Sequence, residues 1–212
     1  MKIALIGATG YVGSKLLDEA LARGHAVTAL VTRPEKLAGR AGVTAVRTDV
    51  LDEAMLTEQL RGMDAVITAF SGHAQADVCA YFVQGFRAIV AATKAAGVPR
   101  LLAVGGAGSL EVAPGVQLVD TPEFPAQWKG TAEGARQALA LLREERELDW
   151  TMLSPAAHLE PGTRTGKFRL GTDALLADEA GHSRISLEDF AVAMLDELER
   201  PAHSRARFSV AY

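Results

Sequence analysis

Residues 3–21 read IALIGATGYVGSKLLDEAL, and this stretch constrains the fold more than any other part of the chain. An apolar run ends at Ile6, glycines follow at positions 7, 10 and 13, and an amphipathic helical pattern comes next. In such a unit the first glycine permits a tight turn, the second lets the backbone approach a pyrophosphate, and the third lets helix and strand pack closely. The stretch therefore predicts a strand, a phosphate-binding turn and a helix whose N-terminus faces the phosphates. Within this turn we expect cofactor contacts from Gly7, Thr9, Gly10, Tyr11, Val12 and Gly13.

The remaining chain alternates strand-length apolar runs with longer helical patterns. The runs are apolar on both faces, as in a parallel sheet covered by helices on each side. This alternation predicts an α/β fold with a doubly wound parallel sheet, a Rossmann fold, in the strand order 3-2-1-4-5-6. We expect one domain over residues 1–212, in which residues 155–212 contribute a small lobe over the carboxyl edge of the sheet. Strands are expected over 2–7, 25–31, 43–49, 64–70, 100–106, 149–155 and 206–212, helices over 13–24, 52–62, 76–96, 127–147 and 186–200, and a loop over 109–125.

The end of the second predicted strand indicates which dinucleotide the turn binds. NAD-binding proteins usually place an acidic residue about 20 residues after the glycines, where it binds the ribose 2′-hydroxyl. This chain has no acidic residue between Glu19 and Glu35, and it carries Arg33 in that region. A guanidinium pairs with a 2′-phosphate that a carboxylate would repel. We therefore predict NADPH (NADP⁺) as cofactor, with NADH as the alternative and a solvated surface charge as the alternative role of Arg33.

Segments after the other predicted strands complete the expected cofactor site, because ligands bind outside the carboxyl ends of the strands. After the third strand, Asp49 is expected to accept from the adenine amino group, with a plain loop residue as the alternative, and Val50 to pack on the ring. The segment after the fourth strand is expected beside the ribose, and the segment after the sixth beside the nicotinamide carboxamide. These two segments comprise Ala69, Phe70, Ser71, Gly72, Pro155 and Ala156.

Composition excludes several other classes of protein. The formal net charge is −4 with acids and bases interspersed, so no basic face is indicated for nucleic acid or an anionic membrane. Cys79 is the single cysteine, which excludes an internal disulfide and a multi-cysteine metal site, and no other spacing suggests a metal. A strand pattern follows Met1 at once and leaves no room for a signal peptide. We expect a cytoplasmic monomer or homodimer whose partner is a small-molecule acceptor.

Five stretches together resemble a known family. They are residues 3–37, TDVLD at 48–52, AVGGAGSL at 103–110, residues 148–171 and residues 185–203. They resemble the atypical short-chain dehydrogenase/reductases, and most strongly the NAD(P)H-binding group of NADH-flavin reductases. That group is similar to biliverdin reductase B and, more distantly, to NmrA-like proteins. The resemblance covers essentially the whole chain and implies a Rossmann fold, a dinucleotide cofactor and reductase activity.

One feature of typical members of this superfamily is missing. They carry a catalytic Tyr and a Lys four residues later on the helix after the fifth strand, where this chain has Trp128 and Lys129. An indole cannot donate a proton as a phenol does. Tyr11 and Lys15 have the required spacing but lie at the start of the first helix, so we interpret that match as coincidence and Lys15 as a solvated residue. A flavin or quinone tolerates the loss, because its delocalised ring accepts a hydride and solvent can supply the proton.

The resemblance to biliverdin reductase B implies catalytic roles for Ser109 and His158, which follow the fifth and sixth strands. The alternatives are a loop or helix-capping serine and a packed loop histidine. Aromatic and apolar residues could form a flat wall for the acceptor: Phe70, His73, Phe124, Trp128 and Leu159. We predict an NADPH-dependent reductase of a flavin, quinone or related planar acceptor, with flavin as substrate and not as a tightly bound group. The alternatives are a non-enzymatic NmrA-like redox sensor and, ranked lowest, a sugar-nucleotide epimerase or dehydratase.

Overall fold

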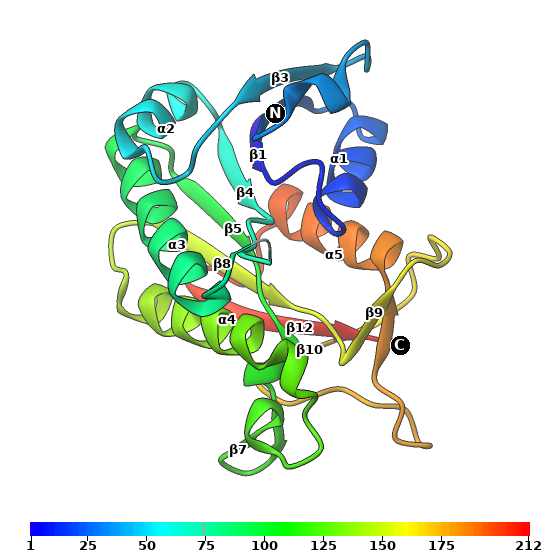
Figure 1. Ribbon diagram of the computed structural model, residues 1–212. Helices are drawn as coiled ribbons and strands as arrows, with labels where there is room; N and C mark the ends of the chain where they lie inside the picture. The colour runs from blue at the N-terminus through cyan, green and yellow to red at the C-terminus, as the bar shows by residue number, and fades with distance from the viewer. Residues whose placement is uncertain (74) are drawn as a thin grey trace.

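The computed structural model describes residues 1–73 and 75–212 and contains a mostly parallel eight-stranded sheet between two layers of helices (Figure 1). The strand order is β3-β2-β1-β4-β5-β8-β12-β10, and β10 alone pairs antiparallel, with β12. This confirms the predicted doubly wound Rossmann fold and the predicted order of its first six strands. The strands are β1 (Lys2–Ile6), β2 (Ala26–Val31), β3 (Val43–Arg47), β4 (Ala65–Thr68), β5 (Arg100–Val104), β8 (Asp149–Ser154), β10 (Arg169–Gly171) and β12 (Ala206–Ala211).

Two hydrophobic cores hold the helices onto the two faces of the sheet. One core includes Phe190 and lies under α1 and α5, which pack against each other. The other includes Phe86 and lies under α2, α3 and α4. Both phenylalanines are almost fully buried, as expected for the centre of each layer. The helices are α1 (Gly13–Ala22), α2 (Glu53–Leu60), α3 (Val78–Ala95), α4 (Ala126–Glu144) and α5 (Leu187–Glu199).

Side-chain caps fix where several helices begin. The Ser186 hydroxyl accepts from the Asp189 amide at 3.0 Å and so caps α5. Asp52 caps α2 and Asp77 caps α3 in the same manner. The start of α1 differs, because no side chain caps it. An uncapped helix N-terminus leaves backbone donors available to a ligand.

The C-terminal segment divides into two parts. Helix α5 and strand β12 belong to the main body, because α5 packs on α1 and β12 continues the sheet beside β8. The part at the carboxyl edge is built around β9 (His158–Glu160) and β11 (Arg184–Ser186), a parallel pair outside the main sheet. We call residues 157–186 the edge lobe. Five further short elements are η1 (Pro34–Leu37), η2 (Ala107–Ser109), β6 (Glu111–Ala113) paired with β7 (Val116–Gln117), and η3 (Leu118–Asp120).

Charged contacts attach the edge lobe to α1 and α5. The Arg164 guanidinium donates twice to the buried Glu19 carboxylate, at 2.8 Å each. Hydrogen bonds from Arg164 lower the pKa of the Glu19 carboxyl, although burial opposes the shift. The fully buried Asp189 carboxylate accepts from the Thr165 amide and hydroxyl at 2.8 and 2.6 Å. These contacts fix the lobe beside the carboxyl ends of the strands.

Candidate functional site

The glycine turn after β1 can be made only with glycine at two of its three positions. Gly7 has φ +81°, and a Cβ there would lie 2.7 Å from the carbonyl oxygen of Ala69. A Cβ on Gly13 would collide with the carbonyl oxygen of Gly7. Gly10 is less constrained, since its Cβ would lie 3.2 Å from that same oxygen. The turn therefore packs backbone against backbone and leaves Gly10, which is exposed, at the surface of a cradle.

Three consecutive amides at this turn make no hydrogen bond within the described part of the chain. They are the backbone N–H groups of Tyr11, Val12 and Gly13. Because they sit at the N-terminus of α1, the helix dipole adds partial positive charge at the same place. Donors and charge of this kind match the phosphate oxygens of a dinucleotide. The turn thus fits a pyrophosphate, and the half-buried Thr9 lies within it.

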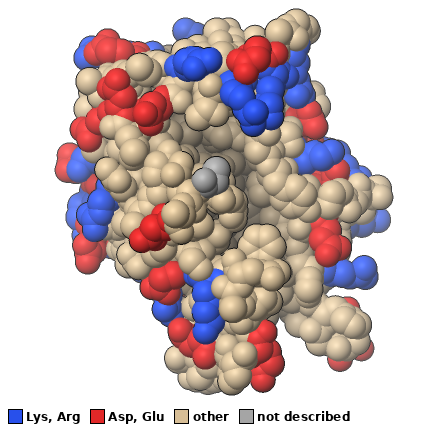
Figure 2. Space-filling view, in the orientation of Figure 1, with Lys and Arg blue, Asp and Glu red and all other residues tan. Residues whose placement is uncertain are grey.

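The end of β2 carries cationic side chains and no carboxylate. Thr32 and Arg33 follow Val31 and are exposed, and Lys36 lies on the short helix η1. Within residues 1–73 and 75–212, Arg33 makes no ion pair. Figure 2 shows a hollow near the centre of this face, bordered mostly by uncharged side chains, with Lys and Arg gathered above it. An unpaired guanidinium beside a phosphate-binding turn suits a 2′-phosphate.

The predicted adenine residues after β3 have roles in the protein itself. The Asp49 carboxylate accepts from the Leu51 amide at 3.0 Å, which makes a local turn and leaves the residue exposed. Val50 is buried in the core that contains Phe86, and its side chain reaches toward Gly85 of α3. The adenine contacts of both residues stay predictions.

The backbone of the segment after β4 packs directly against the backbone of the glycine turn. The Ala69 amide donates to the Ile6 carbonyl at 2.9 Å, so this segment lies directly beside Gly7. The Phe70 ring points into the α3 layer, where it stacks on Phe82 at 5.8 Å between centroids. Phe70 therefore contributes backbone and not a ring face to the edge, contrary to its place in the predicted aromatic wall. Ser71 is exposed at the edge and Gly72 is buried against α3.

The segment after β8 leads from the sheet into the edge lobe. Pro155 and Ala156 are buried, as is Ser154, whose hydroxyl has no hydrogen-bond partner among the described residues. Gly105 of the neighbouring loop lies beside that hydroxyl, and a Cβ there would be 3.0 Å from the oxygen. His158 opens β9 with its side chain exposed, while its amide donates to the Ser183 carbonyl at 3.0 Å. His158 is therefore available to a ligand at the carboxyl edge.

Ser109 lies in a different setting from the one predicted. It is 3% exposed, and its hydroxyl accepts from the Arg207 guanidinium at 3.1 Å. The same guanidinium also reaches the Ser109 carbonyl and pairs with Asp173. This arrangement fixes η2 to β12 beneath the surface. The loop after β5 instead presents Gly105 and Gly106, which are half-buried, nearer the open edge.

The two members of the Tyr-x-x-x-Lys match contact different elements, Tyr11 the edge lobe and Lys15 the first turn of α5. The Tyr11 hydroxyl donates to the Leu159 carbonyl at 3.2 Å, although the residue is 59% exposed. Lys15 forms a 3.0 Å ion pair with Glu188, so it is not the purely solvated residue that we expected. A hydrogen bond to Glu188 raises the pKa of the Lys15 ammonium. Lys15 is thus directed at α5 and not toward the Tyr11 phenol.

On the other side of the edge, aromatic side chains from two elements meet. His73 lies between β4 and α3, and Trp128 lies in the first turn of α4. Their ring centroids are 6.1 Å apart with the planes at 87°. Trp128 is 50% exposed, whereas the other tryptophan, Trp150, is buried in the core. In Figure 1, β9 and α1 lie on the opposite side of the view from α3 and α4.

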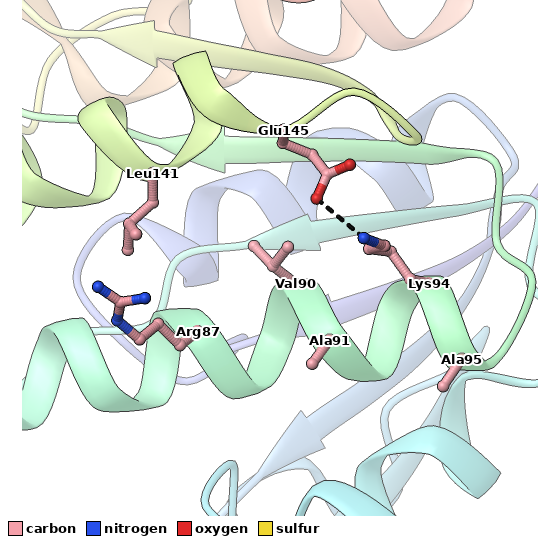
Figure 3. Close-up of a pocket in the computed structure, with 7 residues that line it drawn as sticks. All are labelled: Arg87, Val90, Ala91, Lys94, Ala95, Leu141 and Glu145. Carbon is pink, nitrogen blue, oxygen red and sulfur yellow. Dashed lines mark hydrogen bonds and ion pairs between the residues drawn. The ribbon is translucent and has the colours of Figure 1, made fainter.

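A separate groove of about 490 Å³ lies on the outer surface between α3 and α4 (Figure 3). An ion pair between Lys94 and Glu145 crosses it at 3.3 Å. Both residues lie where these helices end, which is the amino edge of the sheet, so the groove is remote from the glycine turn. Its lining residues are Arg87, Val90, Ala91, Lys94, Ala95, Leu141 and Glu145.

The fold and the glycine turn define a dinucleotide-binding protein, and the comparison with known families agrees. A family model described as NAD(P)H-binding matches residues 7–201, and the chain belongs to that family. It is 42% identical over 213 residues to the uncharacterized protein YwnB of Bacillus subtilis (strain 168), covering 99% of this chain and 98% of that protein. These matches confirm the resemblance stated from the sequence.

Solved structures show the same fold along the whole chain. A Bacteroides thetaiotaomicron protein assigned as an epimerase superposes with a TM-score of 0.93 at 44% identity, covering 100% of this chain and 96% of the other. A Streptococcus pneumoniae protein assigned as an NADH-flavin reductase superposes with a TM-score of 0.84 at 34% identity, covering 100% and 99%. The chain is thus similar to an NAD(P)H-binding oxidoreductase family with flavin reductase-like members.

Two observations bear on other classes of site. Over the part of the chain that the structure describes, no helix is both long and apolar enough to cross a membrane. Within the same residues, no group of three or more His, Cys, Asp and Glu side chains could hold a metal ion.

Proposed function

We propose that this protein is an NADPH-dependent oxidoreductase that reduces a flavin, a quinone or a related planar acceptor. The observation that carries the proposal is the turn at residues 7–13, where three unpartnered amides lie at the start of α1. When bound there, NADPH would supply the hydride for the reduction. The chain's own residues would bind and orient the two ligands and would exclude water between them.

The preference for NADPH over NADH is supported by the charge at the end of β2. Arg33 is exposed and carries no partner within the described residues, so its guanidinium is available to a 2′-phosphate. The first carboxylate after β2 is that of Glu35 on η1, so no carboxylate lies at the strand end, between Val31 and Pro34, to bind a 2′-hydroxyl or to repel the phosphate. Both features favour the phosphorylated cofactor.

Two features of the carboxyl edge support a planar acceptor: the absence of a Tyr-Lys pair within the described residues and the presence of an exposed histidine. Trp128 occupies the start of α4, where typical members of the superfamily carry their Tyr, and Lys15 is paired with Glu188. No phenol with a neighbouring lysine therefore faces the edge within the described chain. His158 is exposed there and its imidazole can accept or donate a proton, so it is our candidate to hold or donate one in the reaction. The NADH-flavin reductase assignment of the S. pneumoniae relative points to the same acceptor class.

Two measurements test the proposal. The first follows oxidation of NADPH and of NADH by purified protein with riboflavin, FMN or a small quinone as acceptor. The second measures the thermal unfolding midpoint with NADPH, NADH and FMN, alone and in pairs, because a ligand of the native state raises that midpoint. We expect turnover with at least one acceptor and a larger shift with NADPH than with NADH. Turnover no faster than the uncatalysed rate with every acceptor would refute the reductase.

A sensor without catalytic activity is the second candidate, favoured by the same absence of the Tyr-Lys pair. Such a protein would bind NADPH and NADP⁺ and would show no turnover with any acceptor. Substitution of His158 would then leave its ligand binding and its behaviour unchanged. An epimerase, the assignment of the B. thetaiotaomicron relative, ranks below both, because the described edge presents no phenol with a lysine beside it for proton transfer: Tyr11 donates to Leu159, and Lys15 pairs with Glu188.

A further inference from the structure

We propose that Trp128 and His73 form the binding surface for the planar ring of the acceptor. The proposal rests on the proposed function, since it assigns the acceptor site of that reductase. It concerns the wall of the carboxyl edge opposite β9, which the cofactor residues leave unassigned.

The topology brings both residues to the edge where the cofactor turn lies. β4 ends at Thr68, and His73 follows before α3 begins. Helix α4 starts at Ala126 and runs back to the amino edge, so Trp128 in its first turn stays at the carboxyl edge. The first turns of the two helices are adjacent, because a Cβ on Gly130 would lie 3.7 Å from the Val78 Cβ.

The geometry of the pair leaves aromatic surface uncovered. The ring planes stand at 87°, and such an edge contact covers at most one face of one ring. Trp128 keeps 50% of its surface exposed, so part of the indole stays open to a ligand. A stacked pair would have closed the faces against each other, as Phe70 and Phe82 do at an interplanar angle of 16°.

A hydrogen bond fixes the orientation of the histidine. The Thr131 hydroxyl lies 3.3 Å from His73 Nδ1, one turn of α4 beyond Trp128. Among the described residues, His73 Nε2 has no partner, so it can exchange a hydrogen bond with a ligand. A ring that stacks on the indole would thus meet one polar group at its edge. This combination of an aromatic face and one oriented polar atom fits an isoalloxazine or a quinone, which carry carbonyl oxygens and ring nitrogens at their rims.

The test measures riboflavin binding to the full chain saturated with NADP⁺, by calorimetry or equilibrium dialysis. Trp128→Ala should weaken riboflavin binding about tenfold or more, because stacking on an aromatic side chain is lost. Trp128→Phe retains a ring face and should stay within about threefold of the wild type. Leu170→Ala is the matched control, since Leu170 is also 50% exposed but lies on edge strand β10 beside the C-terminal part of α5. NADP⁺ binding should be the same in all four proteins.

The outcomes separate this site from the proposed function. Equal riboflavin affinity in Trp128→Ala and the wild type would overturn the site, and so would no riboflavin binding to the wild type. Wild-type binding that depends on Trp128, without NADPH oxidation, would support the site and refute the reductase. Removal of the second contact by His73→Ala should weaken riboflavin binding by a smaller factor than Trp128→Ala, because it deletes one hydrogen bond and leaves the indole face.

Discussion

The Tyr11 hydroxyl and the Leu159 carbonyl are 3.2 Å apart, and this hydrogen bond joins the glycine turn to the edge lobe across 148 positions of the chain. Lys15, four residues on, reaches Glu188 at the start of α5, and Glu188 also accepts from the Gly162 amide of the lobe at 2.8 Å. The Tyr-x-x-x-Lys match at residues 11–15 therefore has a structural role. Both side chains hold the lobe against the segment that is expected to bind phosphates.

Tyr11→Phe should loosen the edge lobe without unfolding the protein. The hydroxyl makes one solvent-exposed hydrogen bond, so its loss should lower the free energy of unfolding by less than about 1 kcal/mol. Backbone amides of β9 should exchange faster with solvent, because local opening becomes easier. Hydrogen exchange measured by mass spectrometry checks this. Tyr81→Phe is the control, since Tyr81 packs on Phe70, and unchanged exchange in β9 of Tyr11→Phe would contradict the prediction.

Two glycines of the turn, Gly10 and Gly13, should respond differently to alanine. Gly13→Ala should destabilise the fold by several kcal/mol or prevent folding, because its Cβ would collide with the Gly7 carbonyl. Gly10→Ala should keep the fold and weaken NADPH binding, since its Cβ meets that oxygen at 3.2 Å and occupies the exposed side of the cradle. Gly130→Ala, in α4 with only a 3.7 Å contact, should be neutral or stabilising by about 0.5–1 kcal/mol. Chemical denaturation and NADPH titration measure both effects, and equal stability loss in Gly10→Ala and Gly13→Ala would contradict them.

Arg33→Ala should separate the two dinucleotides. NADPH affinity should fall about tenfold or more, because a charge-assisted contact to the 2′-phosphate is worth about 1.5–3 kcal/mol. NADH affinity should change little, since NADH has no phosphate at that position. Arg61→Ala provides a control, because Arg61 is an exposed arginine on the far end of α2 that pairs with Glu58. Titration of each variant with NADPH and with NADH measures the two affinities. An equal loss of affinity for both cofactors would show that Arg33 does not recognise the 2′-phosphate.

The order of the first six strands could be predicted because the strand–helix alternation and the glycine turn indicate a doubly wound fold, whose common strand order is 3-2-1-4-5-6. Runs that are apolar on both faces, such as residues 65–68, are typical of buried parallel strands. The edge lobe could not be predicted in this way. Strands β9 and β11 have three residues each, and their pairing joins segments 26 positions apart through contacts such as His158 to Ser183. In a strand of three residues, neither the spacing of apolar residues nor their strand propensity is enough to predict the strand.

The parts of the candidate site that depend on backbone geometry could be predicted from the sequence. The parts that depend on contacts between distant side chains could not. The glycine spacing is sufficient to place Gly7 and Gly13, since only glycine fits between Ala69 and the start of α1. The sequence could not show that Arg207, 98 positions away, takes the Ser109 hydroxyl as an acceptor. His73 and Trp128 were expected in one aromatic wall, but the edge contact between their rings could not be predicted, because one residue follows β4 and the other lies in the first turn of α4.

Acid should detach the edge lobe before it unfolds the rest of the chain. The pKa of the Glu19 carboxyl is lowered, first by hydrogen bonds from Arg164 and also by Arg23. A carboxyl with a lowered folded-state pKa contributes stability above its unfolded pKa, and this contribution is lost as pH falls through the folded value. Glu19→Gln should therefore cost about 1–3 kcal/mol at neutral pH, and the difference from wild type should shrink below about pH 4.

Thermal unfolding of wild type and Glu19→Gln from pH 7 to pH 3 measures this dependence. Glu58→Gln serves as the matched control, because the Glu58–Arg61 pair is exposed on both sides and contributes little. If the difference in unfolding midpoint between wild type and Glu19→Gln stays constant over this range, protonation of Glu19 is not linked to stability and the prediction is wrong.

Ser109→Ala and His158→Ala should have opposite effects if His158 acts at the edge and Ser109 supports the loop beneath it. Ser109→Ala removes an acceptor from the buried Arg207 guanidinium, so it should lower the free energy of unfolding by about 1–3 kcal/mol and leave the KM for the acceptor unchanged. His158→Ala removes an exposed side chain, so stability should change by less than about 0.5 kcal/mol while kcat falls and its pH dependence flattens. Denaturation together with the pH profile of kcat distinguishes the two residues. If kcat falls in Ser109→Ala while the free energy of unfolding is unchanged, Ser109 takes part in the reaction. If the pH profile of kcat is unchanged in His158→Ala, His158 does not take part in it.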